Sequence, residues 1–576
     1  MNRPLAAATV TVCVFVVAGA AQTPVRFTDV TRESGVSFHH INGASPDKHL
    51  VETMGSGGLF FDYDNDGWID LFLVDGGSLA DARVASQAKH RLYHNRGNGT
   101  FDDVSARSGI QHRDYGMGAC AGDYDNDGWI DLYVTNFGPN VLYRNRGDGS
   151  FTDVTAAARV GEPRWSASCA FADLDKDGDL DLFVVNYVDA DRSKTPYCGN
   201  AKLGQRFYCH PLNYPSLPNT LYRNDGHGVF TDVSDASGIG ASRGNGLGLV
   251  VTDYDEDGWP DVFVANDSVA NFLFRNTGKL RFAEAALGAG VAVATDGQAR
   301  AGMGVDAGDY DGSGRQGIVV GNFTNESMAL YRNEGSGLFT DEAPNSGIGK
   351  MSAQSLTFAV FFFDYDLDGL LDVFAANGHV SDDISVVQPN VKYAQAPHLF
   401  RNKGKKKFEE KTGQLGRALQ RAIVGRGAAY GDFDNDGDLD LLITSNNGPA
   451  RLLRNENANQ NDLLRVKLVG TRANRDGIGA KLMLKTAKEK LFNMVKTGSS
   501  YCSQSELPIV FGLGVPEEGK TLALEITWPG GGKDTLTDLK PNQSLTVQEG
   551  KGIIATAPIV FAKPSPTPTP TPQPQQ

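Results

Sequence analysis

The sequence predicts an all-β protein: a seven-bladed β-propeller followed by a small β-sandwich-like domain. Three observations support this class. Asp outnumbers Glu by 52 to 17, and 68 of the 576 residues are Gly; Asp favours turns, caps and metal loops, whereas Glu favours helices and Gly is costly inside them. One Asp-rich motif recurs seven times, each time followed by an alternating apolar run. With 40% hydrophobic residues, the chain is apolar enough to be globular.

The two ends of the chain differ from the middle. Residues 1–21 fit a secretory signal peptide, in which Arg3 supplies the charge, Ala6–Val17 the apolar stretch and Ala18–Ala20 the cleavage site. This stretch is short for a membrane span, so we expect export, with no transmembrane span after signal removal; an uncleaved N-terminal anchor is the alternative. Residues 563–576 form a Pro/Thr-rich tail that should be extended and disordered.

The repeated motif has the form D-x-D-x-D-G-x-x-D. Its copies begin at Asp62, Asp123, Asp173, Asp253, Asp309, Asp364 and Asp432. A Gly/Ala-rich apolar run precedes each copy, and a strand, a hairpin signal such as LYRNRGDGSF and an F-strand follow it. Each unit of about 50 residues therefore offers four short strands with Gly/Asp turns between them. Such units are typical of propeller blades.

The strand count indicates a closed ring over residues 25–461. The last hairpin, at 452–461, has no F-strand after it, and the first F-strand, at 25–31, has no unit before it. We therefore expect the N-terminal strand to complete the last blade and remove the open edges, with an open β-solenoid as the alternative. Residues 187–219 form an insertion that explains one unusually long spacing between motifs.

Each Asp-rich loop can form an oxygen-only cation site. Asp side chains at positions 1, 3, 5 and 9 and the backbone carbonyl of residue 7 would make a cage of high negative charge, which suits Ca²⁺. In the first loop the ligands would be Asp62, Asp64, Asp66 and Asp70 with the carbonyl of Trp68. The candidate ligands of the other complete loops are Asp123, Asp125, Asp127, Trp129 and Asp131; Asp173, Asp175, Asp177, Asp179 and Asp181; Asp253, Asp255, Asp257, Trp259 and Asp261; Asp364, Asp366, Asp368, Leu370 and Asp372; and Asp432, Asp434, Asp436, Asp438 and Asp440.

The fifth loop departs from the pattern. It keeps Asp309 and Asp311, but Ser313 stands at the third Asp position and Gly317 at the last. It should bind a cation weakly or not at all, so we expect about six Ca²⁺ sites. For any single loop the alternative is an Asx-turn without metal. Six complete copies favour the metal, because crowded carboxylates repel one another without a cation.

The motif resembles the FG-GAP (VCBS-type) repeats of integrin α-subunits, which form a seven-bladed propeller with Ca²⁺ in the hairpin loops of the blades. Residues 462–550 lack Asp loops, and their segments GSSYCSQSELPIVFGLG (498–514) and ITWPGGG (526–532) resemble the ASPIC/UnbV domain. The pairing is similar to the cartilage acidic protein 1-like family. The resemblance implies architecture and calcium and, by analogy, extracellular-matrix or adhesion work. It gives Cys502 no role, because the family usually has an aliphatic residue there.

Five cysteines remain after signal removal. Cys198 and Cys209 should form a disulfide that closes a small loop, as an exported chain permits, and a metal site that includes His210 is the alternative. Cys120 and Cys169 lie in equivalent runs of neighbouring blades. We expect them to be buried free thiols, with a disulfide between the blades as the alternative.

The function class follows from what is present and absent in the sequence. We find no nucleophile elbow, zincin helix, P-loop or dinucleotide fingerprint, and we assign no catalytic residues. His40, Glu52 and His379 could meet at one mouth of the central channel; ordinary satisfied polar loops are the alternative.

A net charge of −15 argues against nucleic acid as a partner. We therefore expect an extracellular, periplasmic or cell-surface calcium-binding module that binds a protein or a glycan. One alternative is a lyase or hydrolase that acts on polysaccharide at the channel mouth, and another is an envelope assembly factor.

Overall fold

The computed structural model describes residues 25–561 except 113, 201, 203, 458–460, 517, 518 and 520. The predicted signal peptide and the Pro/Thr-rich tail lie outside the described residues. The described chain is built mainly from four-stranded sheets whose strand pairs are almost all antiparallel, with helices of five residues or fewer between them. The all-β class predicted from the Asp and Gly content is confirmed.

Seven four-stranded antiparallel sheets occupy residues 26–456, and each contains one Asp-rich loop. In chain order their strands are β2 (Gly58–Phe61), β3 (Asp70–Leu73), β4 (Arg91–Asn95) and β5 (Phe101–Asp103); β6 (Tyr115–Gly122), β7 (Asp131–Phe137), β8 (Val141–Asn145) and β9 (Phe151–Asp153); β10 (Ser166–Ala172), β11 (Asp181–Asn186), β15 (Thr220–Asn224) and β16 (Phe230–Asp232); β18 (Gly246–Thr252), β19 (Asp261–Asn266), β20 (Phe272–Asn276) and β21 (Phe282–Glu284); β22 (Val305–Gly308), β23 (Gly317–Val320), β24 (Ala329–Gly335) and β25 (Leu338–Asp341); β26 (Thr357–Phe363), β27 (Asp372–Asn377), β28 (His398–Asn402) and β29 (Phe408–Glu410); and β30 (Gly425–Gly431), β31 (Asp440–Ser445), β32 (Arg451–Glu456) and β1 (Arg26–Asp29).

The N-terminal strand closes the ring, as the strand count predicts. β1 pairs antiparallel with β32, and Phe27 lies opposite Asn455. The first strands of the seven sheets also contact one another in sequence, from β2 through β6, β10, β18, β22 and β26 to β30, and β30 contacts β2. An open solenoid would lack this last contact.

Short elements connect the sheets on their outer side and at one end. The helices are α1 (Ala82–Ala85), α2 (Thr155–Ala158), α3 (Ser234–Ser237), α4 (Ala286–Ala289), α5 (Ala343–Ser346), α6 (Ile348–Ser352), α7 (Ile384–Val387) and α8 (Arg417–Gln420), and the 3₁₀ turns are η1 (Leu50–Thr53), η3 (Pro211–Asn213), η4 (Ile239–Ala241) and η5 (Thr412–Gln414). The predicted insertion contains the hairpin β12 (Cys198–Asn200) and β13 (Gln205–Phe207), followed by β14 (Leu217–Pro218), which pairs with β17 (Arg243–Gly244).

Two further four-stranded sheets follow the ring. Their strands are β33 (Asp462–Val469), β34 (Lys481–Lys485), β35 (Lys490–Met494), β36 (Ile509–Gly514), β37 (Leu522–Thr527), β38 (Lys533–Leu539), β39 (Gln543–Gln548) and β40 (Gly552–Pro558). The orders are β36–β33–β39–β40, with β33 and β39 parallel, and β35–β34–β37–β38. Four apolar runs of the sequence, at 463–470, 480–486, 521–528 and 544–549, indicate strands, and they coincide with β33, β34, β37 and β39.

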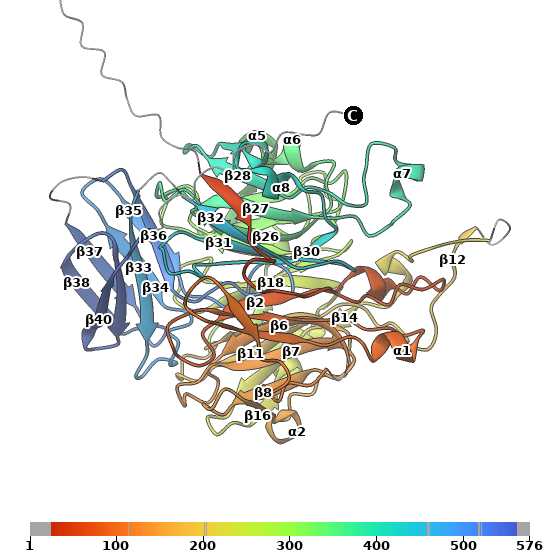
Figure 1. Cartoon of the computed structure of the whole chain (residues 1–576), viewed down its shortest axis with the longest axis horizontal. Coiled ribbons are helices and arrows are strands. Elements are labelled where there is room, and N and C mark those ends of the chain that lie inside the picture. The colour runs from red at the N-terminus through yellow and green to blue at the C-terminus, as the bar shows by residue number, and fades with distance from the viewer. Residues whose placement is uncertain are drawn as a thin grey trace, which may run out of the picture.

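The ring has two distinct faces. The C-terminal sheets cover the face that carries the Asp-rich loops, which we call the loop face; in Figure 1 they lie on the left. β12, α1 and α7 project from the other end, which we call the open face. Leu464 and Leu524 of the C-terminal sheets share one buried apolar cluster with Tyr124 and Phe171 of the ring. The C-terminal sheets are therefore packed onto the ring by a common core.

A segment of the C-terminal part, residues 496–506, fills the centre of the ring. We call it the central segment. Its backbone or side chains form hydrogen bonds with the first strands of five sheets. Carbonyl oxygens of the segment accept three of them: Gln504 O from the Phe60 amide, Cys502 O from the Ala119 amide and Ser500 O from the Val305 amide. The segment donates the other two, from the Cys502 amide to Ser168 Oγ and from Ser500 Oγ to Ala428 O. The Tyr501 ring packs against Phe358 of the sixth sheet. The centre of the ring is thus occupied by protein.

The close approach of this segment explains Gly residues in the runs before the second and seventh Asp loops. A Cβ atom on Gly118 would lie 2.8 Å from Cys502 Cα, and one on Gly427 would lie 2.3 Å from Ser503 Oγ. Larger side chains at these positions would therefore collide with the central segment. Gly is required because another part of the chain approaches the strand closely.

Candidate metal sites

Each Asp-rich loop joins the first and second strands of its sheet. The Gly at position 6 has φ between 82° and 98° in all seven loops, and the residue at position 4 has φ between 54° and 69°. These left-handed residues curl the loop, and the Gly amide donates to the first Asp, at 2.7 Å from Gly128 N to Asp123 Oδ2. The curl turns the carboxylates toward a common centre.

The curled loops bring the predicted ligands together. Groups whose ligand atoms all lie within 4.8 Å of one another include Asp62, Asp64 and Asp66; Asp123, Asp125 and Asp127; Asp173, Asp175 and Asp177; and Asp253, Asp255 and Asp261. In the first loop His94 joins Asp64 and Asp70, with Nδ1 3.1 Å from Asp64 Oδ2. His94 does not stand out in the sequence, because the other sheets have Arg at the equivalent position of the third strand.

Unpartnered carboxylate oxygens distinguish the complete loops from the fifth. Among the described residues, every complete loop contains at least one buried Asp oxygen without a hydrogen-bond partner: Oδ1 of Asp62, Asp64, Asp125, Asp175, Asp253, Asp366, Asp434 and Asp438. A buried anionic oxygen without a partner is costly, so each such atom requires an explanation. An oxygen-ligated cation at the centre of the loop supplies one, and the donor set suits Ca²⁺.

In the fifth loop the carboxylates already have protein partners. Asp309 accepts from the amides of Ser313 and Gly314, and Asp311 accepts from Arg332 Nε at 2.6 Å. At the last position, a Cβ on Gly317 would lie 2.5 Å from a carbon of the Tyr310 ring. This loop therefore has no room for the fourth carboxylate in its present packing.

The electrostatics of the complete loops favour a positive charge inside them. Burial, together with the nearby Asp64 and Asp62, raises the pKa of Asp70 to about 9, although the amides of Asn95 and Tyr63 lower it. Burial raises the pKa of Asp436 to about 8, helped by Asp434 and Asp432. These carboxylates resist ionisation together in the absence of a cation.

The last Asp of each complete loop has a second contact that ties the hairpin together. Asp70 Oδ2 accepts from the Tyr63 amide at 3.1 Å, and Oδ1 accepts from the Asn95 amide of the third strand at 2.7 Å. The equivalent pairs of bonds occur in the other five complete loops. The ninth position thus links the Asp-rich loop to the sheet through hydrogen bonds alone.

A side chain from the third strand also engages most loops. Arg144 Nε lies 2.6 Å from Asp125 Oδ2, and its NH2 lies 2.9 Å from Asp127 Oδ2. Arg275 and Arg401 make the same paired contacts in the fourth and sixth sheets. Because Arg144 takes one oxygen of Asp125, the other oxygen faces the centre of the loop without a partner.

An asparagine network around the ring is a feature that the sequence analysis misses. The Asn at the end of each third strand donates from Nδ2 to the carbonyl of loop position 2 in the preceding sheet. The seven bonds, all between 2.8 and 2.9 Å, are Asn95 to Phe433, Asn145 to Tyr63, Asn224 to Tyr124, Asn276 to Leu174, Asn333 to Tyr254, Asn402 to Tyr310 and Asn455 to Tyr365. The recurrent Asn of the L-Y-R-N segments is the signal in the sequence. The network couples each Asp-rich loop to the next sheet, and the fifth loop retains it.

Basic side chains of the C-terminal sheets reach the first Asp of three loops. Arg465 lies 2.5 Å from both Asp432 Oδ2 and Glu506 Oε2, and Lys467 Nζ lies 3.3 Å from Asp62 Oδ2. Lys481 pairs with Asp253. These contacts use Oδ2 of the first Asp and leave Oδ1 of Asp62 and Asp253 unpartnered.

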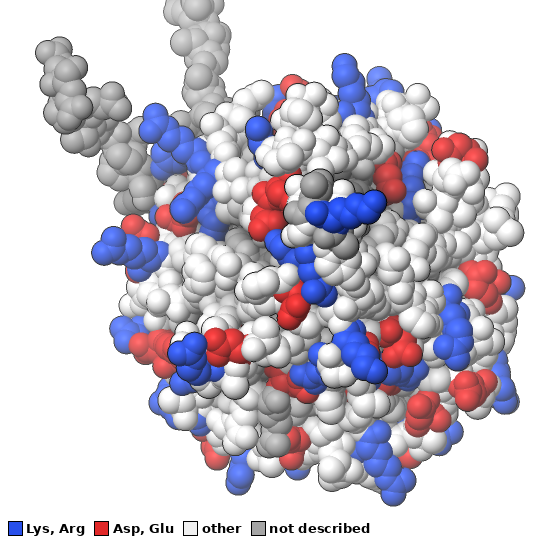
Figure 2. Space-filling model, turned by 90° about the vertical axis from the view of Figure 1, so that its right-hand side faces the viewer, with Lys and Arg blue, Asp and Glu red and all other residues white. Residues whose placement is uncertain are grey.

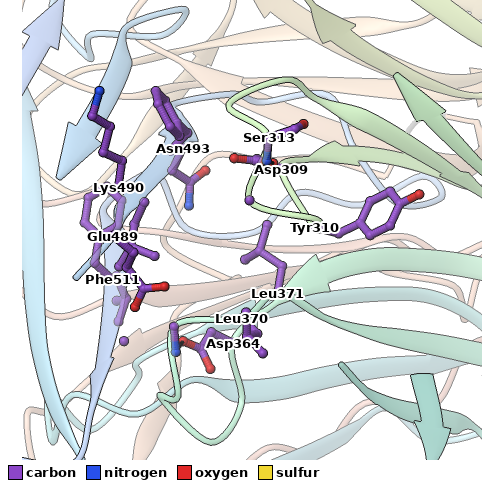
Figure 3. Close-up of a pocket in the computed structure, with 16 residues that line it drawn as sticks. Asp309, Tyr310, Ser313, Asp364, Leu370, Leu371, Glu489, Lys490, Asn493 and Phe511 are labelled. Atoms are coloured by element: carbon purple, nitrogen blue, oxygen red, sulfur yellow. Dashed lines mark hydrogen bonds between the residues drawn. The ribbon is translucent and has the colours of Figure 1, made fainter. Parts of the chain in front are cut away.

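A cavity of about 430 Å³ lies between the fifth and sixth loops and the C-terminal sheets. In Figure 3, Asn493 of β35 faces Asp309 and Ser313 of the fifth loop, Glu489 lies nearer Asp364 of the sixth loop, and the Tyr310 side chain points away. The fifth and the sixth loops thus both border this open space.

The structure corrects one expectation about the cysteines. Cys120 and Cys169 form a disulfide between β6 and β10, so they are not free thiols. The two strands are first strands of neighbouring sheets, and the Gly/Ala-rich packing brings their Cα atoms to 5.8 Å. Cys198 and Cys209 are also bonded, as expected, and their sulfurs are not available for a metal site with His210. Cys502 is free and buried in the central segment.

His40, Glu52 and His379 all lie near the open face, but they do not form one cluster. The Glu52 carboxylate accepts from Ser45 and from the Tyr208 hydroxyl at 3.1 Å. His40 Nδ1 accepts from the Asn447 amide and His379 Nδ1 from the Ser381 amide. Burial and the nearby Arg426 lower the pKa of His40 to about 3 and that of His379 to about 4, so both rings are neutral at pH 7.

Comparison with known families identifies the class of protein. The family model described as FG-GAP-like repeat matches residues 62–134, 123–184, 212–264, 253–320 and 309–375, and the model described as ASPIC and UnbV matches 470–554. The chain belongs to the family of FG-GAP-like repeat proteins that carry an ASPIC/UnbV domain.

The particular relatives are cartilage acidic protein 1 from several animals. The human protein is 32% identical over 311 residues, which covers 52% of this chain and 43% of that protein. The proteins of Mus musculus and Xenopus tropicalis are 31% and 29% identical, over 52% and 53% of this chain and 44% of each relative. The match spans less than half the length of these relatives.

Two solved structures were compared with the fold. One is an Agrocybe aegerita lectin that recognises non-reducing terminal N-acetylglucosamine, with 16% identity, a TM-score of 0.38 and coverage of 63% of this chain and 82% of that one. The other is BBS1N in complex with ARL6DN, with 10% identity, a TM-score of 0.39 and coverage of 74% and 96%. TM-scores this low carry no argument about the function of this chain.

Proposed function

We propose that the protein is an exported calcium-binding module for a protein or glycan partner, built as a seven-bladed β-propeller (25–461) with a β-sandwich-like domain that begins at residue 462. The observation that carries the proposal is the set of unpartnered buried Asp oxygens, which occur in all six complete loops and are absent from the described part of the fifth. The sites would hold about six Ca²⁺ ions.

In each complete loop the ion would be held by the Asp residues at positions 1, 3, 5 and 9 and by the carbonyl at position 7. Calcium would neutralise the crowded carboxylates and stiffen the turn between the first two strands. The protein itself would position the ligands: the amide of the Gly at position 6 orients the first Asp, and the last Asp is hydrogen-bonded to the third strand. We assign the ion a structural role and no catalytic step.

Export is supported by two disulfides, since disulfides persist in oxidising compartments. The cleavable signal at 1–21 remains a proposal from the sequence. In the described part of the chain, no helix has the length and apolar character needed to cross a membrane.

A binding role, rather than catalysis, is supported by the family and by the surface. Both matching family models describe repeats or associated domains, and relatives carry the name of cartilage acidic protein 1. On the open face, acidic and basic side chains are interspersed (Figure 2), which suits a mixed protein or glycan partner more than a polyanion such as nucleic acid.

The proposal is tested by two measurements on the full chain. Removal of calcium with EDTA should lower the melting temperature by many degrees, because repulsion among carboxylates returns in six loops. A crosslinking pull-down from the native envelope or medium, with and without calcium, should recover a surface protein or glycan when calcium is present. An unchanged melting curve in EDTA would contradict the calcium role, and an empty pull-down in both conditions would contradict the binding role.

A further inference from the structure

The open face contains a cavity that is separate from the Asp-rich loops. It has a volume of about 260 Å³ and is lined by residues of several sheets and of the insertion. The polar lining groups include Asp267, Glu326 and His379, and the apolar ones include Met54, Met303 and Phe323. Ligand sites in proteins typically combine such an apolar wall with a few convergent polar groups.

The central segment lies behind the part of the cavity wall that Met54 forms. Tyr501 of that segment donates from its hydroxyl to Met54 O at 2.7 Å, and Met54 lines the cavity. Behind His379, the fully buried Arg426 donates to the carbonyls of Thr53, Gly378 and His379. A ligand can therefore enter from the open face but cannot pass through the ring.

His379 offers an unused hydrogen-bond donor. Its Nδ1 accepts from the Ser381 amide at 3.0 Å, so in the neutral ring the proton resides on Nε2. The side chain is 98% buried, since its exposure is 2%, and Nε2 has no partner among the described residues. A buried donor without an acceptor is costly, and a ligand atom would satisfy it.

Two carboxylates provide acceptors in the same cavity. Glu326 accepts a hydrogen bond from the Ala301 amide at 2.7 Å, and a carboxylate has further lone pairs with which to accept from a ligand. Asp267 is buried and accepts from the Tyr187 hydroxyl at 2.6 Å and from Ser268 Oγ at 2.8 Å. Burial raises the pKa of Glu326, and repulsion from the nearby Asp267 carboxylate raises it as well, so the two acidic groups interact electrostatically.

The donor and acceptors together select the chemistry of the ligand. An anion would be repelled by Glu326 and Asp267. An ammonium group would be attracted by these carboxylates, but it offers no acceptor to the Nε2–H of His379, and the Arg426 charge behind that ring opposes it. A hydroxyl group both donates and accepts, so adjacent hydroxyls can serve Glu326 and His379 together. The apolar wall of Met54, Met303 and Phe323 suits the C–H face of a small ring.

We propose that this open-face cavity binds a single neutral sugar ring, with His379 as a hydrogen-bond donor and Glu326 as an acceptor for its hydroxyls. The volume of about 260 Å³ lies at the small end for ligand pockets, which limits the occupant to about one ring. The inference deepens the proposed binding function by naming the ligand class and its site, and it rests on that function.

The experiment is calorimetric titration of the calcium-loaded full chain with the methyl glycosides of glucose, galactose, mannose and N-acetylglucosamine. Glucosamine and glucuronate serve as the cationic and anionic arms. At least one neutral glycoside should bind with a Kd of ~1 mM or tighter. The charged sugars should bind at least tenfold more weakly than that glycoside.

Variants locate the binding. Glu326→Gln keeps the shape and can still accept from Ala301, and His379→Phe keeps a ring against Phe323 while it removes the donor. Each should weaken the glycoside at least tenfold with unchanged calcium content. The control Glu409→Gln changes an exposed carboxylate on β29 and should not affect binding. Should His379→Phe fail to fold, Glu326→Gln alone decides.

The inference is overturned when none of the neutral glycosides binds, when the charged sugars bind as tightly as the neutral ones, or when Glu326→Gln binds as the wild type does. These results are distinguishable from failure of the proposed function. Calcium-dependent capture of a surface partner that persists in Glu326→Gln would leave the binding module intact and remove the sugar site.

Discussion

The asparagine network leads to a quantitative prediction for Asn145→Ala. Asn145 is 1% exposed. Its Nδ2 donates to Tyr63 O at 2.8 Å and to Ile130 O at 3.0 Å, and its Oδ1 accepts from the Gly147 amide at 3.0 Å. The variant loses three hydrogen bonds and leaves their partners unsatisfied, at about 1 kcal/mol each, which gives a loss of ~3 kcal/mol in the free energy of unfolding.

The assay is calorimetric melting of the calcium-loaded protein. An unfolding entropy of about 0.9 kcal/mol/K, for the roughly 430 residues of the seven sheets, converts the loss into a decrease of ~3 °C in melting temperature. Asn98→Ala is the matched control, because Asn98 is exposed and caps the local turn to Thr100, so its loss should be below ~0.5 kcal/mol. Equal melting temperatures for the two variants would refute the role of the network.

Three further variants test other features. The double variant Cys120→Ala/Cys169→Ala should lower the melting temperature by a few degrees, because this disulfide joins two sheets and contributes ~2–4 kcal/mol to the free energy of unfolding. The double variant Cys198→Ala/Cys209→Ala should increase proteolysis of the insertion without a comparable change in melting temperature. Equal decreases in melting temperature for the two double variants would contradict this assignment. Gln504→Ala should lower the free energy of unfolding by ~2 kcal/mol and increase hydrogen exchange of the backbone amides in the central segment. The reason is that the Gln504 side chain accepts from Ala121 N at 2.9 Å and donates to Ala121 O at 3.2 Å. Unchanged exchange in the segment would show that the ring does not hold it. Gly317→Asp should destabilise the protein by ~1–3 kcal/mol and add no calcium site, because its Cβ meets the Tyr310 ring and the Tyr331 carbonyl; a seventh bound calcium would contradict this prediction.

Most of the strands of the ring, and the way in which the ring closes, can be predicted from the sequence. The position of each sheet follows from its Asp motif and its L-Y-R-N hairpin, and the closure by the N-terminal strand follows from the unmatched F-strand at 25–31. The grouping of carboxylates also follows, because the D-x-D-x-D-G spacing with Gly at position 6 allows a single local geometry. Local periodicity and turn chemistry determine these features.

Contacts between distant segments were not predictable in this way. The central segment lies more than 300 residues from most of its partners, and its hydrogen bonds with Ala119, Ser168 and Val305 involve backbone groups or a single hydroxyl. The Gly residues of the first strands hold the complementary signal, but small residues alone do not reveal what fills the space beside them. The disulfide of Cys120 and Cys169 likewise depends on the packing of two sheets.

Some site residues depend on context that the motif alone does not contain. His94 takes the place of Arg in the first sheet and lies within ligand distance of Asp64, whereas Arg144 uses one oxygen of Asp125 and leaves the other free. The asparagine network required knowledge of which sheets are neighbours. The sequence indicates His379 as a polar residue at the channel mouth, but the cavity partners Asp267 and Glu326 come from other sheets.

The central claim is that the six complete loops are calcium sites and that the fifth is not. Isothermal titration of the metal-free protein with calcium, with elemental analysis of the saturated product, tests it most directly. The account predicts about six Ca²⁺ per chain, a loss of one with Asp125→Ala in the second loop, and no loss with Asp311→Ala in the fifth. Saturation with no bound calcium, or an equal loss of one ion in both variants, would contradict it.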